Sequence, residues 1–368
     1  MIRYLKQEEK IETRAMYEAN FSEDTRAFVD YYYTHKTADN RILVMEEAGK
    51  LQVMIHLNPY SFRICGQSVP VNYVVAVATD PSVRKQGKMA AVMEKALSDM
   101  AAAHQPFTFL IPANYKVYLS SGFAFVPTEK YEEVLQTVEV PESQATLQAA
   151  EVSESRMALQ AAEVSGDRVT FQDAENADIP AMSRLANELL EREYDIFPEH
   201  TEDYYRRMMA EMECQNGGLV LIRREKSLQG KEQRITGIFS YGREEDQAEL
   251  QELLAEKECR EELVQSINGW LLTNPGNSIG ASEMNFMFRI LELPTLVHML
   301  SCRKPFSMKV HVQDNILSKN TGSYEIRIGR ERGTILDIPM EETECTMDIS
   351  ELTRYLFGKM RIFIREWV

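Results

Sequence analysis

The chain contains 368 residues, a length that predicts about two or three domains rather than one. With 44% hydrophobic residues and no apolar run near the ~20 that a membrane helix requires, it is expected to be globular and free of the membrane. The net charge of −16 argues against nucleic acid as a partner, because an acidic protein does not attract phosphate backbones. The same charge is compatible with a cationic substrate, or with solubility alone.

The cysteines and histidines argue against two further classes of protein. The five cysteines and six histidines are dispersed along the chain, without the close pairs of a zinc site and without a disulfide framework. No metal cofactor is therefore expected. The first residues lack the charged and then apolar segments of a signal peptide, so the expected location is the cytoplasm.

Residues 1–140 alternate between helix-like and strand-like patterns. The expected elements are a helix that includes residues 28–33, strands at residues 41–46, 51–57, 61–65, 71–78 and 107–111, and a helix over residues 89–100. Glu47-Ala48-Gly49-Lys50 has turn chemistry and predicts a hairpin. The unbroken apolar run at residues 71–78 predicts a strand buried on both faces. The helix that follows it has apolar residues at the spacing of one helical face.

A near repeat marks the first domain boundary. Residues 147–153 recur unchanged at residues 159–165, which predicts a linker, disordered or partly helical, at residues 141–165. The elements expected after it are a helix at 179–194, strands at 219–223 and 235–241, and a helix at 246–272. The last part is expected to combine strands at 285–290, 306–312 and 323–328, helices at 293–300 and 349–357, and an apolar terminal strand at 360–368.

The segment between the fourth strand and its helix carries the clearest functional signal. It reads Arg84-Lys85-Gln86-Gly87-Lys88, with two adjacent cations and a glycine that lead directly into the helix. Free amides and the helix dipole attract phosphate to a helix N-terminus, and a glycine lets the backbone approach the anion closely. The spacing matches neither a P-loop nor a dinucleotide fingerprint. Alone, the pattern is compatible with an anion site or with a solvated helix start.

Together with Val75-Ala76-Val77-Ala78 before it and Pro81 within it, this segment resembles the acetyl-CoA site of the GCN5-related N-acetyltransferases (GNATs). In that family the strand binds the pantetheine arm, and an Arg/Gln-x-x-Gly-x-Gly/Ala motif binds the pyrophosphate. Met89 departs from this motif, because Gly or Ala is usual there. The resemblance implies acetyl-CoA as co-substrate, with the pantetheine on Val75, Ala76 and Val77 and the pyrophosphate on Arg84, Lys85, Gln86, Gly87 and Lys88.

Two further segments narrow the resemblance. Phe109-Leu110-Ile111-Pro112-Ala113 and Tyr118-Leu119-Ser120-Ser121-Gly122-Phe123 are similar to segments of the enhanced-intracellular-survival acetyltransferases. That group implies an α+β fold with two tandem GNAT-fold domains, each a mixed sheet flanked by helices, and a final domain resembling sterol carrier protein 2. The resemblance places the catalytic domain at residues 1–140, a degenerate second copy at 166–282 and the sterol-carrier-like domain at 283–368. It also implies a homo-oligomer, since relatives form hexamers.

The resemblance implies catalytic roles in the transfer of an acetyl group to an amine. Tyr118 would be the general acid that protonates the departing thiolate, and Tyr115 is the rival candidate. The base would be the terminal carboxylate of Val368, delivered into the first domain; otherwise the last strand only completes the sheet of the third domain. Relatives acetylate aminoglycosides, other polyamines or lysine side chains, so the expected partner is a small-molecule or lysine amine.

Two functions of other classes stay open. If the third domain keeps a hydrophobic tunnel, the protein would be a carrier or sensor of an apolar ligand. Alternatively, the acetyltransferase unit would be a regulator that binds acyl-CoA without turnover. Turnover with any amine would exclude the regulator, and tight CoA binding without turnover would favour it.

Overall fold

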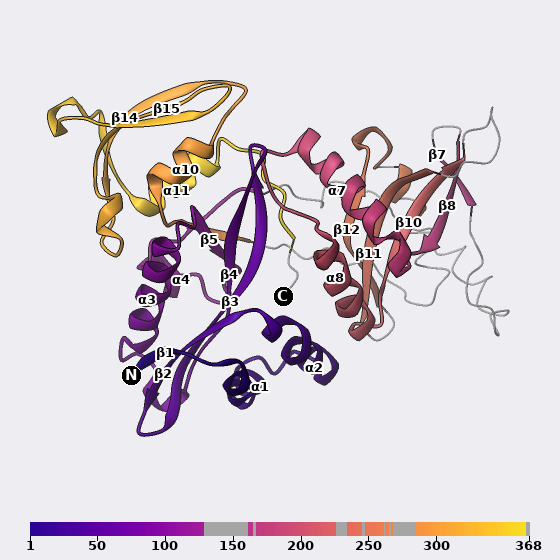
Figure 1. Cartoon of the computed structure of the whole chain (residues 1–368), viewed down its shortest axis with the longest axis horizontal. Coiled ribbons are helices and arrows are strands. Elements are labelled where there is room, and N and C mark those ends of the chain that lie inside the picture. The colour runs from indigo at the N-terminus through magenta and orange to yellow at the C-terminus, as the bar shows by residue number, and fades with distance from the viewer. Residues whose placement is uncertain are drawn as a thin grey trace.

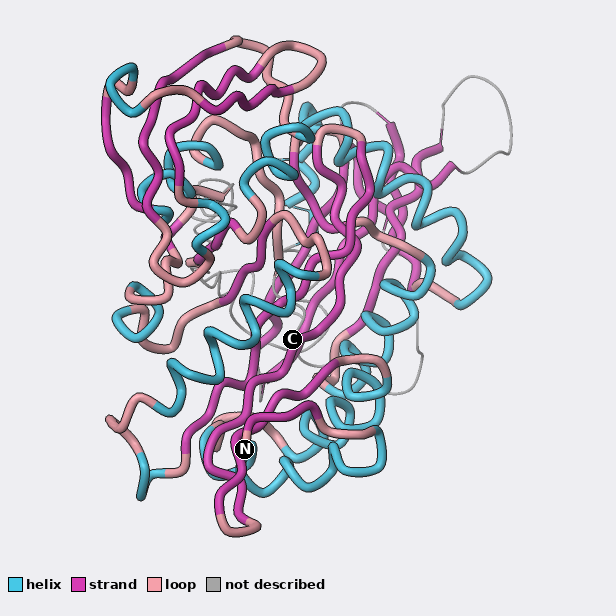
Figure 2. The backbone as a smooth tube through the Cα atoms, turned by 60° about the vertical axis from the view of Figure 1, so that its left-hand side comes forward, coloured by secondary structure: helices cyan, strands magenta, loops and turns pink. Residues whose placement is uncertain are grey.

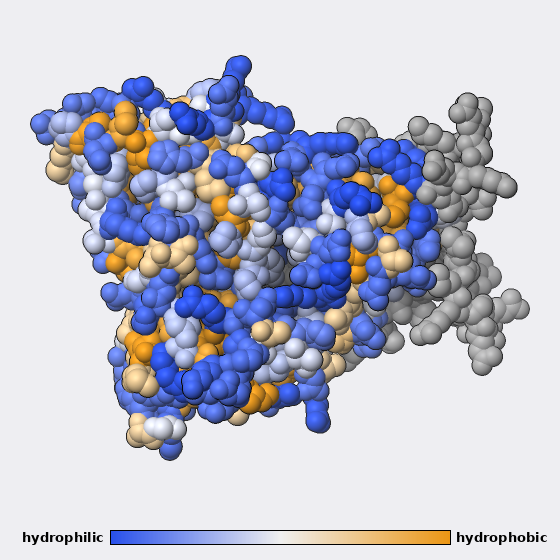
Figure 3. Space-filling view, in the orientation of Figure 1, coloured by the Kyte–Doolittle hydropathy of each residue, from blue (hydrophilic) through white to orange (hydrophobic). Residues whose placement is uncertain are grey.

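The computed structural model describes residues 1–128, 161–164, 167–225, 234–244, 247–260, 262–264, 266–267 and 285–365. Within these residues the strands form an eight-stranded, a five-stranded and a four-stranded sheet, which we call the first, second and third sheets (Figure 1). None of the helices in this part of the chain is long and apolar enough to cross a membrane. The face drawn in Figure 3 is mainly hydrophilic, with apolar side chains in small separate patches.

The first sheet is built mostly from the N-terminal residues. Its strands, in spatial order, are β1 (Ile2–Tyr4), β2 (Arg41–Glu47), β3 (Lys50–Ile64), β4 (Gln67–Thr79), β5 (Phe107–Leu110), β13 (Met287–Ile290) and β6 (Ala124–Phe125), and β9 (Ile196–Pro198) pairs with the end of β3. The predicted hairpin is confirmed, although the strands expected at residues 51–57 and 61–65 form the single long strand β3. All neighbours are antiparallel except β4 and β5, which are parallel.

Helices cover both faces of this sheet. On one face lie α1 (Arg14–Asn20) and α2 (Arg26–His35), with the short turns η1 (Gln7–Thr13) and η2 (Lys36–Ala38), and on the other lies α3 (Lys88–Ala102) (Figures 1 and 2). Strand alternation explains the two layers. Ile42 and Val44 of β2 pack with α1 and α2, whereas Leu43 between them packs in the core that contains α3.

Strand β13 comes from far along the chain and lies between β5 and β6. Phe288 is opposite Phe109 of β5 on one side and Ala124 of β6 on the other. Its ring stacks on Phe107 at 5.2 Å and meets Phe357 edge-on at 5.0 Å. A strand was expected at residues 285–290, but the sequence gives no sign that it completes the first sheet.

The second sheet repeats the plan of the first half of the first sheet. A strand, two helices and three antiparallel strands follow one another as β8 (Asp167–Asp173), α7 (Ile179–Glu193), α8 (Glu202–Cys214), β10 (Gly218–Glu225), β11 (Arg234–Glu244) and β12 (Gln247–Ala255), with β7 (Ala161–Val164) added beside β8. The order β12-β11-β10-β8 matches β4-β3-β2-β1. This second unit is therefore a partial structural repeat of the first.

The helix expected at residues 246–272 is wrong over its first part, where residues 247–255 form β12. This stretch is rich in Glu and Leu, which favour a helix. Its pairing with β11 from Gln247 to Ala255 overrides that preference, since residues on both faces of β12, Leu253 and Leu254, are buried. The helix at 179–194 and the strands at 219–223 and 235–241 are confirmed as α7, β10 and β11.

The third sheet has the order β16-β15-β14-β17 and packs with two helices. Its elements are α10 (Leu293–Met299), β14 (Phe306–Gln313), β15 (Gly322–Ile328), β16 (Gly333–Asp337), β17 (Cys345–Asp348) and α11 (Ile349–Phe357). The strands expected at residues 306–312 and 323–328 and the helices expected at 293–300 and 349–357 are confirmed. The strand expected at residues 360–368 is wrong over its described part, 360–365, where Ile362 forms only an isolated bridge. Asp348 and Glu351 form a capping box at the start of α11.

The final residues run between the first and second units. Ile362 forms one parallel bridge with Ile196, and the amide of Phe363 donates to the Ile196 carbonyl at 3.0 Å. Ile362 and Ile364 pack into the core of the first sheet, whereas Phe363 packs into the core around α7 and α8. The terminal segment thus joins two cores rather than extending the third sheet. Residues 366–368 lie outside the described residues.

The predicted linker also falls largely outside the described residues, since the structure describes only 161–164 of residues 141–165. Those four residues form β7, which pairs with β8. The boundaries predicted at residues 140, 165 and 282 stay predictions.

Replacing Phe288 with Ala should destabilise the protein by about 3–5 kcal/mol, because it removes a fully buried ring that joins two sheets' cores. The measurement is the urea midpoint. Phe125→Ala on the neighbouring strand is the control, because that ring is 37% exposed and its loss should cost little. Equal shifts for the two variants would contradict the structural importance of β13.

Candidate functional site

Strand β4 carries a bulge at the residues predicted to hold the pantetheine. Met54 of β3 is opposite Ala78 and His56 is opposite Val75, so Ala76 and Val77 together face the single residue Ile55. Ala76 has a φ of 50°, which is strained for a residue with a side chain. A bulge of this kind bends the strand and turns peptide groups out of the ladder.

Beyond one residue pair, strands β4 and β5 separate. Their register consists of Tyr73 opposite Phe109, and these two rings stack at 4.9 Å. From Val74 to Thr79, β4 has no strand partner on that side within the described part of the chain. The peptide groups that face this open side, including those at the bulge, can bind an extended ligand as an added strand would.

The chain then passes directly to the start of α3. Asp80 caps the turn η3 (Pro81–Val83) by accepting from the Ser82 amide at 2.8 Å. Lys85 and Gly87 both have left-handed backbones, with φ of 62° and 76°, and Gly87 is the N-cap of α3 without any side-chain cap. Successive amides in such a loop, together with the free amides of the helix start, form a concave anion site.

Space around Gly87 is open, since a Cβ built there meets no atom within 4 Å. The side chains of the loop divide into two groups. Arg84 donates to the Thr79 carbonyl at 3.2 Å and to Asn20 at 2.8 Å, and Lys88 pairs with Glu47 at 2.5 Å. The side chains of Lys85 and Gln86 are exposed and make no hydrogen bond with other described residues. Of the charged side chains at residues 84–88, only Lys85 has no partner among the described residues.

The two tyrosines predicted as candidates for the general acid differ in burial. Tyr118 lies on α4 (Lys116–Leu119) and is 8% exposed, whereas Tyr115 is 42% exposed and packs on Phe125 at 5.5 Å. Burial raises the pKa of Tyr118 to about 12. Its hydroxyl makes no hydrogen bond with another described residue, so its proton is available to a ligand. Tyr118 belongs to the same hydrophobic cluster as β4 and β5.

A pocket of about 230 Å³ lies between the first and second units, next to β3. Its wall includes Asn58, which is opposite Tyr73, the last residue of β4 that pairs with β5. The pocket is thus one strand away from the point where β4 and β5 separate. Two buried polar atoms of its wall, the Asn58 Nδ2 and the Tyr204 hydroxyl, have no partner among the described residues. Unsatisfied groups of this kind favour a polar ligand or ordered water.

The charged residues of the pocket wall are Asp39, Glu199, Asp203, Glu211, Lys36 and Arg207. Each carboxylate has a cationic partner: Lys36 pairs with Glu211 at 3.1 Å, Arg207 with Asp39 at 2.5 Å, Arg63 with Glu199 at 2.5 Å and Arg206 with Asp203 at 2.6 Å. Acidic groups exceed basic groups in the wall itself. The partners reduce this negative charge but leave many hydrogen-bond acceptors.

Val368, the predicted base, lies outside the described residues. The chain can be followed to Arg365, and at Phe363 it packs against Tyr194 and His200 at 5.2 and 6.2 Å between ring centres. His200 is the residue next to Glu199, which lines the pocket. The described end of the chain therefore runs beside the segment that forms one wall of the pocket.

The second unit has the same bulge but a different loop. Ser240 is opposite Glu252 and Tyr241 is opposite Leu250, so Gln251 is the extra residue of β12, as one residue is extra in β4. The residues that follow β12 read Glu256-Lys257-Glu258-Cys259-Arg260-Glu261-Glu262, without a glycine and with four glutamates. A loop of this charge repels phosphate, which agrees with the prediction that this unit is degenerate.

A family model for the acetyltransferase (GNAT) domain matches residues 1–126. Similar solved structures include a protein of unknown function from Enterococcus faecalis described as a probable N-acyltransferase, with 15% identity, 98% of this chain and 90% of that chain covered, and a TM-score of 0.69. A GCN5-related N-acetyltransferase from Anabaena variabilis has 13% identity, 99% and 94% coverage and a TM-score of 0.68. Eis1 from Mycobacterium abscessus has 12% identity, 97% and 88% coverage and a TM-score of 0.61. No curated protein matches the sequence.

Residues 1–126 are therefore a GNAT acetyltransferase domain, and the predicted class of enzyme, an acyltransferase, is confirmed. The likeness to the solved structures over almost the whole chain confirms the α+β fold class with GNAT-like units in tandem. It concerns the fold alone at these identities. The assignments of single residues, the subtype within the GNATs and the sterol-carrier-like third domain stay predictions.

Sequence reasoning missed the residues that the fold brings to the site from elsewhere. Asn58 and the pocket residues of α8 belong to no motif, and only the pairing of the two units places them together. The bulge at Ala76 has no sequence signal beyond the small residues Ala76 and Ala78. That the protein has no metal cofactor stays a prediction. The described residues contain no cluster of potential metal ligands.

The Tyr118 hydroxyl should stay protonated at a pH where an ordinary tyrosine ionises. Because burial raises its pKa from 10.0 to about 12, its contribution to folding stability is complete below pH 10.0 and is lost as the pH rises toward 12. The measurement is the tyrosinate absorbance of the wild type minus that of Tyr118→Phe. At about pH 11 the difference should correspond to roughly one-tenth of a tyrosinate, and a nearly complete tyrosinate would contradict the burial.

Proposed function

We propose that the protein is an acetyl-CoA-dependent N-acetyltransferase that acts on a primary amine of a small cationic molecule or of lysine. The observation that carries this proposal is the continuous path formed by the free half of β4 and the uncapped start of α3. An extended arm that ends in phosphates fits this path, because the strand offers peptide groups and the helix start offers amides. GNAT acetyltransferases use acetyl-CoA, which has this shape and charge.

Acetyl-CoA, when bound, supplies the thioester whose acetyl group is transferred. Val75, Ala76 and Val77 would hold the pantetheine through their peptide groups at the bulge. The amides of residues 84–88 would hold the pyrophosphate, with the free ammonium of Lys85 in support. Arg84 and Lys88, which already have protein partners, would act mainly through their backbone.

The reaction forms a carbon–nitrogen bond and breaks the carbon–sulfur bond of the thioester. Tyr118 would donate its proton to the departing thiolate, a role that suits a buried hydroxyl without a protein partner. The terminal carboxylate of Val368 would accept the proton that the attacking amine loses. This role rests on the resemblance and on the course of the chain toward the pocket, up to Arg365.

The pocket beside β3 is the proposed site of the acceptor. It lies one strand from the separation of β4 and β5, and its wall offers carboxylates together with the free Asn58 amide and Tyr204 hydroxyl. The carboxylates, which exceed the cations in the wall, favour an ammonium-bearing molecule over an anion, and the Asn58 Nδ2 can donate to an acceptor atom of the same molecule. A cytoplasmic location, a homo-oligomer and an apolar ligand in the third domain are separate predictions of the sequence.

Gly87→Glu should raise the dissociation constant of acetyl-CoA at least about tenfold, because a carboxylate at the anion site repels phosphate by ~1.4 kcal/mol or more. Isothermal titration calorimetry measures the change. Gly49→Glu is the matched control: Gly49 also has a left-handed backbone, with φ of 72°, and open space around it, but lies in the β2–β3 turn. Equal weakening by the two substitutions would remove the loop from the cofactor site.

Tyr118→Phe should lower kcat by about 10²–10⁴-fold, the usual contribution of a general acid, while Tyr115→Phe should leave kcat close to the wild type. The measurement is acetyl-CoA consumption against a panel of amines that includes polyamines, aminoglycosides and a lysine peptide. A form without Val368 should lose kcat as well, because its new terminus is one residue shorter.

Each result has a counterpart that contradicts part of the proposal. Normal turnover by Tyr118→Phe would show that another group is the acid, and normal turnover without Val368 would remove the terminal carboxylate from the mechanism. Tight acetyl-CoA binding without turnover of any amine would instead favour the regulator that only binds acyl-CoA.

A further inference from the structure

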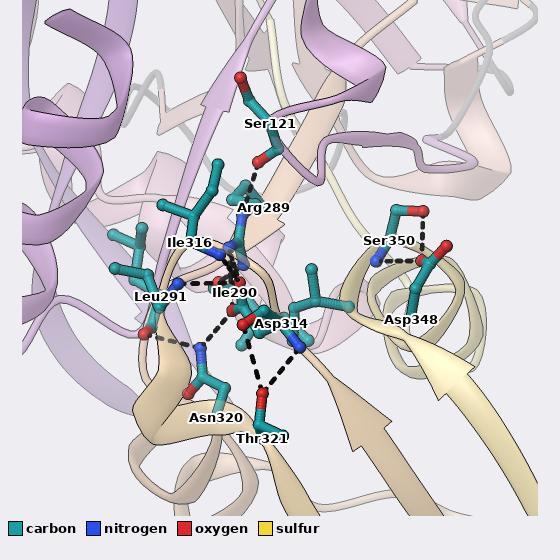
Figure 4. Close-up of polar contacts among 12 residues, drawn as sticks. Ser121, Arg289, Ile290, Leu291, Asp314, Ile316, Asn320, Thr321, Asp348 and Ser350 are labelled. Atoms are coloured by element: carbon teal, nitrogen blue, oxygen red, sulfur yellow. Dashed lines mark hydrogen bonds and ion pairs between the residues drawn. The ribbon is translucent and has the colours of Figure 1, made fainter. Parts of the chain in front are cut away.

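Arg289 of β13 is a fully buried cation that touches two parts of the molecule (Figure 4). Its Nη2 donates to both carboxylate oxygens of Asp314, at 2.7 and 2.9 Å, in the loop after β14. Its Nε donates to the carbonyl of Ser121 at 2.8 Å, and its Nη1 donates to the Ile290 carbonyl. One guanidinium thus connects the loop after β14 of the third sheet to the turn at residues 120–123, which follows α4.

That turn is hydrogen-bonded to Tyr118 of α4. The amide of Ser121 donates to the Tyr118 carbonyl at 3.0 Å, and the amide of Phe123 donates to the same carbonyl at 3.4 Å. Ser121 therefore links the two residues: its carbonyl accepts from Arg289, and its amide donates to the Tyr118 carbonyl. Helix α4 has only four residues and cannot fix its own direction, so its position depends on such outside contacts.

Gly122 shows how closely Arg289 approaches the turn. A Cβ built on Gly122 would lie 2.8 Å from the Arg289 Nε and 2.8 Å from Ile349, and Gly122 has a φ of 79°. The turn is thus packed directly on the guanidinium. Both strands that flank the turn, β5 and β6, also pair with the strand that carries Arg289.

Asp314 is itself held by hydrogen bonds from residues that follow it closely in the sequence. It accepts from the amides of Ile316 and Leu317 at 3.1 and 2.9 Å and from the Asn320 side chain at 2.9 Å. The carboxylate is therefore fixed before it meets Arg289. A fixed carboxylate and a planar guanidinium bound at both ends leave the Ser121 carbonyl little freedom.

We propose that Arg289 is a positioning residue for the acetyl transfer: it holds the Ser121 carbonyl, anchored by Asp314, and thereby sets the place of the Tyr118 hydroxyl. This inference rests on the proposed role of Tyr118 as the acid. A buried ion pair adds little net stability compared with apolar residues of similar size, but it fixes geometry. A proton donor needs such geometry, because it must stand within hydrogen-bond reach of the departing atom.

The test uses the whole chain and a double-mutant cycle between Arg289 and Tyr118. Arg289→Lys keeps a charge for Asp314 but cannot bind Asp314 and Ser121 together in the same plane. It should lower kcat about tenfold or more, which corresponds to ~1.4 kcal/mol, with little change in the KM for acetyl-CoA. In the Tyr118→Phe background the same substitution should cause no further loss, because the group that it positions is already absent.

A purely structural role is tested by two other variants. Thr353→Val removes a fully buried hydroxyl that accepts from the Ile290 amide next to Arg289 and donates to the Ile349 carbonyl, with no hydrogen bond to Tyr118 or Ser121, so it should lower the melting temperature and leave kcat unchanged. Arg289→Met combined with Asp314→Leu removes both charges together and leaves no unpaired charge, so it should fold. Its kcat should fall as in Arg289→Lys.

Wild-type kcat in the folded double variant, or losses that add fully in the Tyr118→Phe background, would overturn the inference and leave the proposed function intact. Loss of kcat in Thr353→Val equal to that in Arg289→Lys would also overturn it, because general destabilisation would then explain both. Normal turnover by Tyr118→Phe is a different result: it removes the proposed acid, and the inference falls with it.

Discussion

The pairing of β13 with both β5 and β6 is the constraint on which the first unit depends. Without this strand, β5 and β6 would each present an open edge, and the segment between them, which includes α4, would lose its contact with Arg289. Residues 287–290 follow the whole second unit in the chain, so the first sheet cannot be completed until the last part of the protein is present. Pairing over such a sequence distance is slow to form and links the folding of the units.

The same strand order explains why β4 serves both the core and the site. Its first half lies between β3 and β5, and the stacked rings of Tyr73 and Phe109 mark the last point of contact with β5. Its second half keeps β3 on one side and leaves the other side free. The bulge at Ala76 lies in this free half, so the strained backbone is supported by β3 on the side opposite to the proposed pantetheine path.

Much of the local structure could be predicted from the sequence, because it depends on short-range patterns. The apolar spacing of α3, the turn at Gly49 and the loop at Gly87 are each determined by a few neighbouring residues. The failures have a common cause in long-range pairing. Residues 247–255 have a helical composition but become β12 against β11. Residues 287–290 read Met-Phe-Arg-Ile, and this composition does not indicate which sheet they join.

The candidate site divides in the same way. The proposed cofactor path consists of one continuous segment, residues 73–88, and a motif can describe it. The pocket combines Asn58 of β3 with residues of α8, and no spacing in the sequence predicts that two separate units meet there. Tyr118 was named through a resemblance, and its burial relative to Tyr115 then distinguished the two tyrosines physically.

The contact between the first and second units is not built for stability alone. Lys36 of the first unit and Glu211 of the second are both almost fully buried and pair at 3.1 Å, with the Tyr31 hydroxyl donating to the same carboxylate at 3.0 Å. Burial raises the pKa of Glu211, and the Lys36 ammonium opposes that rise. Apolar residues of similar size would hold the units together at least as well. The charged pair instead keeps the pocket between them polar, and the second unit contributes one wall of this pocket, the proposed acceptor site, which the first unit could not form alone.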